Sequence, residues 1–358
     1  MGVGLADGAR TGTTEGGPDT PAHGPNVLIA IDGGNSKTDV AIATMEGELL
    51  ARRRGPGYSP HVSGVQDAVT GLEGLVRDAL SDAGVPFGSM RILHTAAYLA
   101  GVDLAREQRE MHSAILARGW SPSATVDNDT FALLRLGTTE GLGVAVVCGA
   151  GINCVGANDR ELVRFPSLGP ISGDWGGGLQ LGVEAMSAAA READGRGEAT
   201  ALTGVVLDHF GAARVIDVVE RLHFGELATT RLGELSPAVF TAAEHGDAVA
   251  NRLVERLADE VADYAIAAAV RLGVADGSGD GGTAGSVPDT VPVVLGGGVL
   301  AARRPLFTSL VESRIRSRVP HVEFRYVTDA PILGAVLLGL DHLGRTVERG
   351  ALLTPGGR

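Results

Sequence analysis

The stretch IDGGNSKTDV, residues 31–40, follows an apolar segment and interrupts it with a short loop of glycines and hydroxyl side chains. The loop surrounds Lys37, the only lysine among the 30 basic residues of the chain. Glycine lets backbone N–H groups approach phosphate oxygens closely, which suits a phosphate-binding turn. The P-loop spacing, GxxxxGK followed by Ser or Thr, is absent. The stretch is therefore either a nucleotide site of another design or a plain glycine-rich turn.

The composition is that of a globular protein with a substantial core. The chain has 358 residues, of which 44% are hydrophobic, and this length is enough for two domains. The formal net charge is −13, and no basic stripe appears along the sequence. Nucleic-acid binding needs clustered lysine and arginine, and we interpret the short run of arginines at 52–54 as a solvated strand edge. We therefore expect no nucleic-acid partner.

The cysteines and the apolar runs exclude further classes of protein. Cys148 and Cys154 are the only two cysteines, too few for a disulfide framework or a four-cysteine metal site. The first 25 residues lack the apolar centre of a signal peptide, and no apolar run approaches the ~20 residues of a membrane helix. These features predict a cytoplasmic protein with reduced thiols and no membrane contact.

The first half of the chain predicts an antiparallel meander followed by helices and a further strand. Residues 1–25 are typical of a disordered tail. Period-two and buried patterns then predict the strands, and a 3.6-residue apolar repeat predicts the first helix. The expected strands cover 26–32, 39–44, 49–54 and 91–97, and the expected helices cover 64–83 and 105–117.

The second half repeats this order. Residues 143–158 predict a strand, a glycine-rich turn and a second strand, and 161–164 supply a third. A long helix is expected over 247–272, a flexible surface insertion over 274–290, a buried strand ending in three glycines over 291–300, and an apolar helix over 331–340. The repetition predicts a duplicated α/β architecture.

Three glycine turns each follow a predicted strand, at Gly33–Gly34, Gly149–Gly151 and Gly296–Gly298. Ligands bind at the carboxyl edge of an α/β sheet, and strands that end in glycine place close backbone amides at that edge. A single turn of this kind is weak evidence, but three together indicate an anion site.

Acidic residues stand where phosphoryl transfer would need them. Asp32 ends the first strand, and a carboxylate there can hold Mg²⁺ beside nucleotide phosphates. Asp127 and Asp129 lie in TVDNDTFALL, and Asp174 lies in SGDWGGG. Asp129 could equally cap the helix that follows it, and Asp174 could equally shape a turn.

The order of these segments resembles the acetate and sugar kinase, Hsp70 and actin superfamily. DGGNSKT, NDT, CGAGIN, GDWGGGLQLG and GGGV are more closely similar to the BadF/BadG/BcrA/BcrD ATPase family, which includes N-acetylglucosamine kinase. The resemblance implies an α/β fold of two ribonuclease H-like domains of the actin-like ATPase type with a cleft between them. The domains would cover 26–128 and 129–345, with a last helix at 331–343 packing toward the first domain and a tail at 346–358.

The same resemblance implies a role for each matched residue. Asp32 would be the metal-associated acid for Mg²⁺, and Asp129 would be the catalytic base. The expected ATP-binding residues are Gly33, Gly34, Asn35, Ser36, Lys37, Thr38, Gly149, Ala150, Gly151, Gly296, Gly297 and Gly298. The expected sugar-binding residues are Ser59, Asn128, Asp129, Asn153, Asp174 and Trp175. Trp175 replaces an acidic residue of the family pattern, and Ser59 stands where the family often carries asparagine.

The function implied is ATP-dependent phosphorylation of an amino sugar, with N-acetylglucosamine phosphorylated at its 6-hydroxyl as the leading expectation. Family kinases are usually dimers, so a homodimer is expected. A kinase for glucosamine or another sugar stays open, as does a reductase-activating ATPase that would need cysteines at a subunit interface. A sugar-sensing repressor is a weaker alternative, because a 25-residue tail cannot form a DNA-binding domain.

Overall fold

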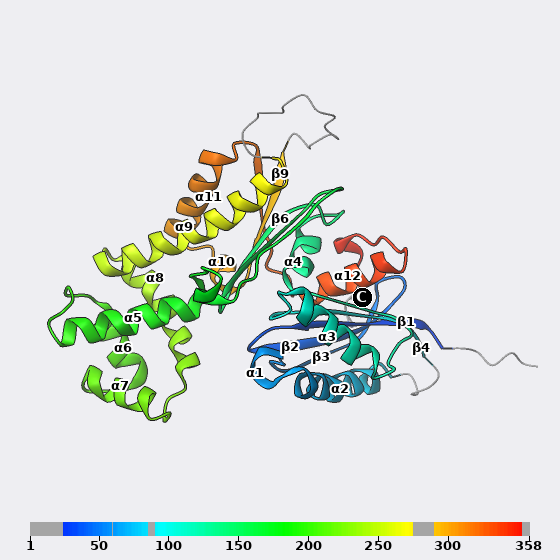
Figure 1. Ribbon diagram of the computed structural model, residues 1–358, viewed down its shortest axis with the longest axis horizontal. Helices are drawn as coiled ribbons and strands as arrows, with labels where there is room; N and C mark the ends of the chain where they lie inside the picture. Colours follow the sequence, from blue (N-terminus) through cyan, green and yellow to red (C-terminus); the bar gives the residue numbers. More distant parts are fainter. Residues whose placement is uncertain (1–23, 59, 85–89, 275–289, 353–358) are drawn as a thin grey trace, which may run out of the picture.

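Two five-stranded sheets organise the chain, and Figure 1 shows their two domains side by side. The computed structural model describes residues 24–58, 60–84, 90–274 and 290–352. In the first sheet the order is β3-β2-β1-β4-β5. The first three strands pair antiparallel, whereas β4 and β5 run parallel to β1. Their bounds are β1 Asn26–Gly33, β2 Lys37–Thr44, β3 Leu49–Pro56, β4 Arg91–Leu99 and β5 Ala124–Asp127.

The second sheet repeats this topology in the order β10-β9-β6-β7-β8. Again three consecutive strands pair antiparallel, and two later strands lie parallel beside the first of them. The bounds are β6 Gly143–Cys148, β7 Ile152–Ala157, β8 Leu162–Arg164, β9 Val291–Gly296 and β10 Val322–Tyr326. The predicted duplication is therefore confirmed at the level of strand order.

The first sheet is buried on both faces because helices cover each side. Seven of the eight residues of β1 are buried, and the same is true of β2. Helices α2 (Val65–Asp82) and α3 (Ala105–Leu116) pack on one face, and α12 (Ile332–His342) packs on the other. Figure 1 shows α12, at the end of the chain, lying over this first sheet. A sheet covered on both faces selects the near-continuous apolar runs seen in its strands.

Helices α4 (Thr130–Gly137) and α12 join the two domains. Leucines of α4 pack with strands of the second sheet, whereas apolar residues of α12 pack on the first. The buried Arg135 of α4 donates to Asp341 of α12 at 2.6 Å. Gly334 of α12 lies so close to α4 that a Cβ there would stand 2.0 Å from the carbonyl oxygen of Ala132. The two connecting helices therefore form one tightly packed unit between the sheets.

The second domain carries a lobe of helices that the sequence analysis did not predict. Helices α9 (Ala248–Arg271) and α11 (Pro305–Arg318) pack against each other on the second sheet's side, and only α9 was expected. The lobe extends from the end of this domain (Figure 1) and contains α5 Gly177–Ala193, α6 Leu202–Phe210, α7 Val215–His223, the 3₁₀ turn η2 Thr229–Leu235 and α8 Ser236–Glu244. Shorter elements are α1 Pro60–Ser63, η1 Gly169–Ile171, α10 Gly298–Ala301 and η3 Arg349–Ala351.

Some predicted segments lie outside the described residues. These are Ser59, most of the tail 1–25, most of the insertion 274–290 and the last residues of the tail 346–358. Within the described residues, no helix is both long and apolar enough to cross a membrane.

Candidate active site

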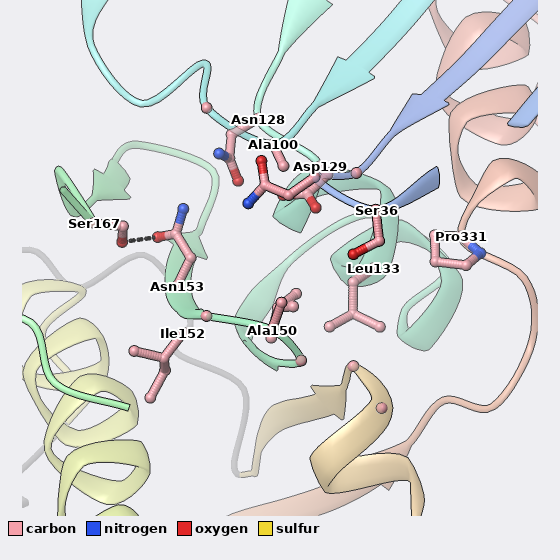
Figure 2. Close-up of a pocket in the computed structure, with 18 of the residues that line it drawn as sticks. Ser36, Ala100, Asn128, Asp129, Leu133, Ala150, Ile152, Asn153, Ser167 and Pro331 are labelled. Carbon is pink, nitrogen blue, oxygen red and sulfur yellow. Dashed lines mark hydrogen bonds between the residues drawn. The ribbon is translucent and has the colours of Figure 1, made fainter. Parts of the chain in front are cut away.

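A cavity of about 670 Å³ opens between the two domains (Figure 2). Most of its walls come from loops that follow β1, β4 and β5 in the first domain and β6, β9 and β10 in the second, and α1, the start of β7 and the segment after β8 complete them. In each sheet the parallel strands point their carboxyl ends at the cavity, which is where the parallel strands of an α/β sheet gather loop residues. The duplicated topology therefore places one set of loops from each domain opposite the other.

Three of the predicted phosphate segments meet in this cavity. Its lining includes Gly34, Asn35, Ser36 and Lys37 from the first loop, Gly149, Ala150 and Gly151 from the second, and Gly297 and Gly298 from the third. The first turn is closed by a hydrogen bond of 2.8 Å from the Gly34 N–H to the Lys37 carbonyl. At Gly297 φ is 87°, and a Cβ would lie 2.5 Å from the carbonyl oxygen of Cys148, so only glycine fits. One end of the cavity is consequently rich in exposed backbone.

Three other predicted nucleotide residues do not line the cavity. A Cβ on Gly33 would meet Leu99 at 2.6 Å, and one on Gly296 would meet Leu133 at 2.5 Å, so both glycines serve close packing at the strand ends. Thr38 is buried, and its hydroxyl accepts a hydrogen bond of 3.3 Å from the Tyr58 N–H. These three residues therefore pack at the strand ends next to the loops and do not line the cavity.

Asp32 is a buried acid at the edge of the cavity. Burial, and then the negative charges of Asp129 and Asp39, raise its pKa to about 8. Asp39 itself is neutralised by Arg54 and Arg52, at 2.8 and 3.2 Å. A buried carboxylate whose neighbours destabilise its charge is a suitable oxygen donor for a divalent cation.

Asp129 and Asn128 follow β5 and enter the cavity from the first domain (Figure 2). Asp129 is the residue before α4, and its side chain makes no capping hydrogen bond there. Burial raises the pKa of Asp129 to about 6, while hydrogen bonds from backbone N–H groups oppose the rise. The Asn128 side-chain oxygen instead accepts a hydrogen bond of 3.0 Å from the Thr130 N–H. The capping alternative for Asp129 is therefore not what the structure shows.

Asp103 also lines the cavity, and the sequence analysis missed it. Its side chain is only 6% exposed. One carboxylate oxygen, Oδ1, accepts hydrogen bonds from the Nδ2 groups of Asn128 at 2.8 Å and Asn153 at 2.9 Å. Burial, then Asp129 and Glu107, raise the pKa of Asp103 to about 7. Asp103 comes four residues after β4, so the rule that ligands gather at the carboxyl ends of parallel strands could have identified it.

Three further residues complete this side of the cavity. Asn153 begins the β7 side of the second glycine loop, and its Oδ1 accepts a hydrogen bond of 2.5 Å from the Ser167 hydroxyl (Figure 2). His61 of α1 lies with its Nε2 3.8 Å from Oδ2 of Asp103 and 3.6 Å from Oε1 of Glu107. Neither Ser167 nor His61 was predicted: the matched pattern singled out Ser59 but not His61 two residues later, and Ser167 lies in a segment without a recognisable motif.

Two predicted sugar-binding residues lie outside the cavity lining. Asp174 accepts hydrogen bonds from the Tyr264 hydroxyl and, at 2.5 Å, from the Ser172 hydroxyl. Trp175 donates from Nε1 to Glu184 at 3.2 Å, and the Arg256 guanidinium lies 4.1 Å from its ring centroid. Both side chains are thus engaged within the second domain. Their proposed contact with a sugar stays a prediction.

The paired sheets and the cleft at their carboxyl edges define an actin-like ATPase fold. The chain aligns with a structural-genomics target from Chromobacterium violaceum whose name proposes an N-acetylglucosamine kinase. The TM-score is 0.65 at 22% identity, over 88% of this chain and 99% of that one. It also aligns with the glucokinase of Streptomyces griseus solved with glucose and AMPPNP, at a TM-score of 0.53, 16% identity, and 89% and 99% coverage. The predicted fold, two ribonuclease H-like domains with a cleft, is confirmed.

More narrowly, the chain belongs to the BadF/BadG/BcrA/BcrD ATPase family, whose profile matches residues 29–339. It is 27% identical over 330 residues to the N-acetyl-D-glucosamine kinase of Dictyostelium discoideum, covering 88% of this chain and 98% of the relative. It is 28% identical over 230 residues to the N-acetylmuramic acid/N-acetylglucosamine kinase of Clostridium acetobutylicum, covering 64% and 74% respectively.

Proposed function

We propose that this protein transfers the γ-phosphoryl group of ATP to a hydroxyl group of an amino sugar, with the 6-hydroxyl of N-acetyl-D-glucosamine as the first candidate. The observation that carries the proposal is one cavity with two chemically different ends. Glycine loops line one end, and the carboxylates of Asp129 and Asp103 stand at the other. Both similar curated proteins are named as kinases of N-acetylglucosamine, which supports this substrate.

In the proposed reaction the loops hold the phosphates and Asp129 acts as general base. The backbone N–H groups around Gly34, Gly151 and Gly298 would orient the β- and γ-phosphates through the approach that glycine permits. Asp129 would accept the proton of the sugar hydroxyl as its oxygen attacks the γ-phosphorus, and ADP leaves. Asp103, fixed by its two asparagine donors, would bind a sugar hydroxyl and orient it toward Asp129.

Mg²⁺ fits the acidic residues that line this cavity. We propose Asp32 as the residue that holds it, because this buried carboxyl has a raised pKa, to which the negative charge of Asp129 contributes. When bound, Mg²⁺ neutralises negative charge on the phosphates during transfer. A homodimer and a cytoplasmic location remain predictions that rest on the family resemblance and the composition.

The cysteines weigh against the reductase-activating alternative. An iron–sulfur cluster shared between subunits needs thiolates at a surface. Both cysteines of the chain are fully buried, and burial raises the pKa of the Cys148 thiol to about 12. Neither thiol is placed to reach a partner subunit.

A sugar-dependent ADP-release assay tests the proposed function. The purified protein with ATP and Mg²⁺ should release ADP rapidly when N-acetylglucosamine is added, and the product should be the 6-phosphate by NMR. Glucosamine, glucose and N-acetylmannosamine serve as comparison substrates. If no amino sugar stimulates ADP release, the assignment as an amino-sugar kinase is wrong.

A further inference from the structure

The acceptor end of the cavity, which we define as the lining around Asp103, Asn128, Asp129, Asn153, Ser167 and Ile171, contains two acidic side chains that no arginine or lysine of the described lining pairs with. Its polar groups are two carboxylates, two amides and a hydroxyl. In the described part of the chain the cavity lining contains no arginine, and its one lysine, Lys37, belongs to the phosphate loop. His61 is the only other basic residue there, and it already lies between the carboxylates of Asp103 and Glu107.

A nearby arginine is occupied elsewhere. Arg164 of β8 donates to both carboxylate oxygens of Asp127, with the Nη2–Oδ2 distance at 2.7 Å. Its guanidinium also lies 4.5 Å from the ring centroid of Phe131. Recruiting Arg164 to a ligand would therefore break a bidentate ion pair, which leaves Asp127 without its partner.

Neighbouring acidic residues disfavour the ionised form of Asp103. Asp129 and Glu107 both act to raise the pKa of Asp103, in addition to the larger effect of burial. A site in which ionised acids are disfavoured also disfavours an incoming anion at the same place, because the same repulsion acts on it. At the rim stands Ile171, 88% exposed, which offers apolar contact and no countercharge.

We propose that the acceptor end selects an uncharged N-acyl amino sugar and discriminates against one that carries a carboxylate. This inference rests on the proposed function and goes beyond it, since the relative from Clostridium acetobutylicum is named for both kinds of sugar. N-acetylmuramic acid is N-acetylglucosamine with a lactyl ether on O3, which adds both bulk and a negative charge. Like charges placed together at a binding site lower affinity strongly, and specificity is the difference that results.

Three sugars separate charge from bulk: N-acetylglucosamine, N-acetylmuramic acid and the methyl ester of N-acetylmuramic acid. The acid and its ester differ in charge but hardly in size. We expect kcat/KM for the acid to be lower than for the ester by about tenfold or more. The gap should narrow at high ionic strength, because salt screens the repulsion.

The outcomes are distinct. Equal or better use of the acid overturns the inference while leaving the kinase assignment intact. If acid and ester are both refused while N-acetylglucosamine is phosphorylated, bulk makes the selection and the charge argument is wrong. If none of the three sugars stimulates ADP release, it is the proposed function itself that fails.

A matched pair of variants checks the electrostatic cause. Ile171→Arg places a positive charge at the cavity rim and should narrow the gap between acid and ester severalfold. Leu162→Arg adds the same charge at an exposed position of β8 that does not line the cavity, and it should leave the gap unchanged. A gap that responds equally to both variants, or to neither, contradicts a local charge effect. Ile171→Gln shows what loss of the apolar side chain alone does.

Discussion

The Asn153 side chain, from the second domain, donates a hydrogen bond of 2.9 Å to Asp103 of the first domain, so this bond links the two domains at the wall of the cavity. Asn128 of the first domain donates to the same oxygen at 2.8 Å. Asp103 is thereby oriented by both halves of the molecule at once. The position of the Asp103 carboxylate therefore depends on how the two domains are placed relative to each other. The geometry of the acceptor end thus depends on the geometry of the cleft.

Removing the Asn153 donor should weaken sugar binding. A hydrogen bond to a charged group contributes about 1.5–3 kcal/mol, so Asn153→Ala should lower kcat/KM for the sugar by about ten- to a hundredfold. Most of the loss should appear in KM for the sugar, with KM for ATP little changed. Asn158→Ala is the control, since Asn158 bonds to the Leu272 carbonyl away from the cavity. An equal loss in both variants would point to a general folding defect.

The proposed base can be tested against its neighbour. Asp129→Asn should reduce kcat by about 10²–10⁴-fold, because the amide cannot accept the hydroxyl proton. ATP binding, followed by calorimetry, should persist. Asp103→Asn should raise KM for the sugar more than it lowers kcat. If Asp103→Asn lowers kcat more than Asp129→Asn does, the base role belongs to Asp103 instead.

Asp32 should matter more than Lys37. Asp32→Asn should lower kcat by at least about a hundredfold, and the Mg²⁺ concentration for half-maximal activity should rise, because the variant loses the proposed metal-binding carboxylate. Lys37→Met should have a smaller effect, since in the proposed site backbone amides supply most of the phosphate contacts. Chelation by EDTA should abolish activity in the unmodified protein. Lys37→Met proving the more damaging change would rule out this division of roles.

His94 predicts an acid-sensitive contribution to stability. It is fully buried, stacks on His342 at 4.1 Å between ring centroids, and faces the hydroxyls of Ser123 and Thr125 at 2.9 and 3.1 Å. Burial, then His342 and His112, lower its pKa from 6.5 to about 4. As the pH falls, His94 is therefore protonated at a higher pH in the unfolded chain than in the folded protein. The stability that depends on neutral His94 is fully present well above pH 6.5 and is lost as the pH falls from about 6.5 toward 4.

The size of this effect can be isolated by difference. Between pH 6.5 and pH 5, His94 should cost the folded state about 1.5 kcal/mol, measured by denaturant unfolding. His94→Gln keeps hydrogen-bonding capacity but does not titrate, so its stability should fall less over the same interval. Parallel curves for the two proteins would show that His94 does not carry the acid sensitivity.

Gly182, within the GDWGGGLQLG stretch, should tolerate no side chain. A Cβ there would lie 1.8 Å from the carbonyl oxygen of Leu232, which belongs to η2. Gly182→Ala should lower the free energy of unfolding by about 1–3 kcal/mol or more through overpacking. Gly204→Ala in α6 meets open space and should be neutral or stabilise by about 0.5–1 kcal/mol. Equal effects at the two positions would contradict the packing argument.

Much of the fold could be predicted from sequence because the sheets are covered on both faces. Strands such as β1 and β6 are then nearly continuous apolar runs followed by glycine, which local patterns reveal. The helical lobe α5–α8 was not predicted, although glycines with positive φ, at 195, 211 and 225, follow three of its helices. The glycine-rich motif at 173–182 overlaps the first turns of α5, and because glycine is a poor helix former the helical pattern is weak there.

The site was predicted unevenly for a related reason. Asp32, Asp129 and the glycine loops stand in short motifs of adjacent residues, so the sequence alone could propose them, and the structure brings Asp32, Asp129 and most of the loop residues to one cavity. Asp103 gains its position from Asn153, fifty residues later in the chain, and no local pattern encodes that contact. Asp174 matches a motif, yet one of its partners is Tyr264 on α9, a contact that only the tertiary structure reveals.

The packing of α12 on the first sheet has a consequence for synthesis. Residues of β1 and β4 such as Leu28, Ala30 and Ala96 are buried beneath α12, whose own residues are translated long after them. The first domain therefore cannot close its core until α12 has been made. Until α12 has left the ribosome, one face of that sheet stays uncovered, and a nascent chain stalled before residue 332 should be a ready substrate for chaperones and proteases.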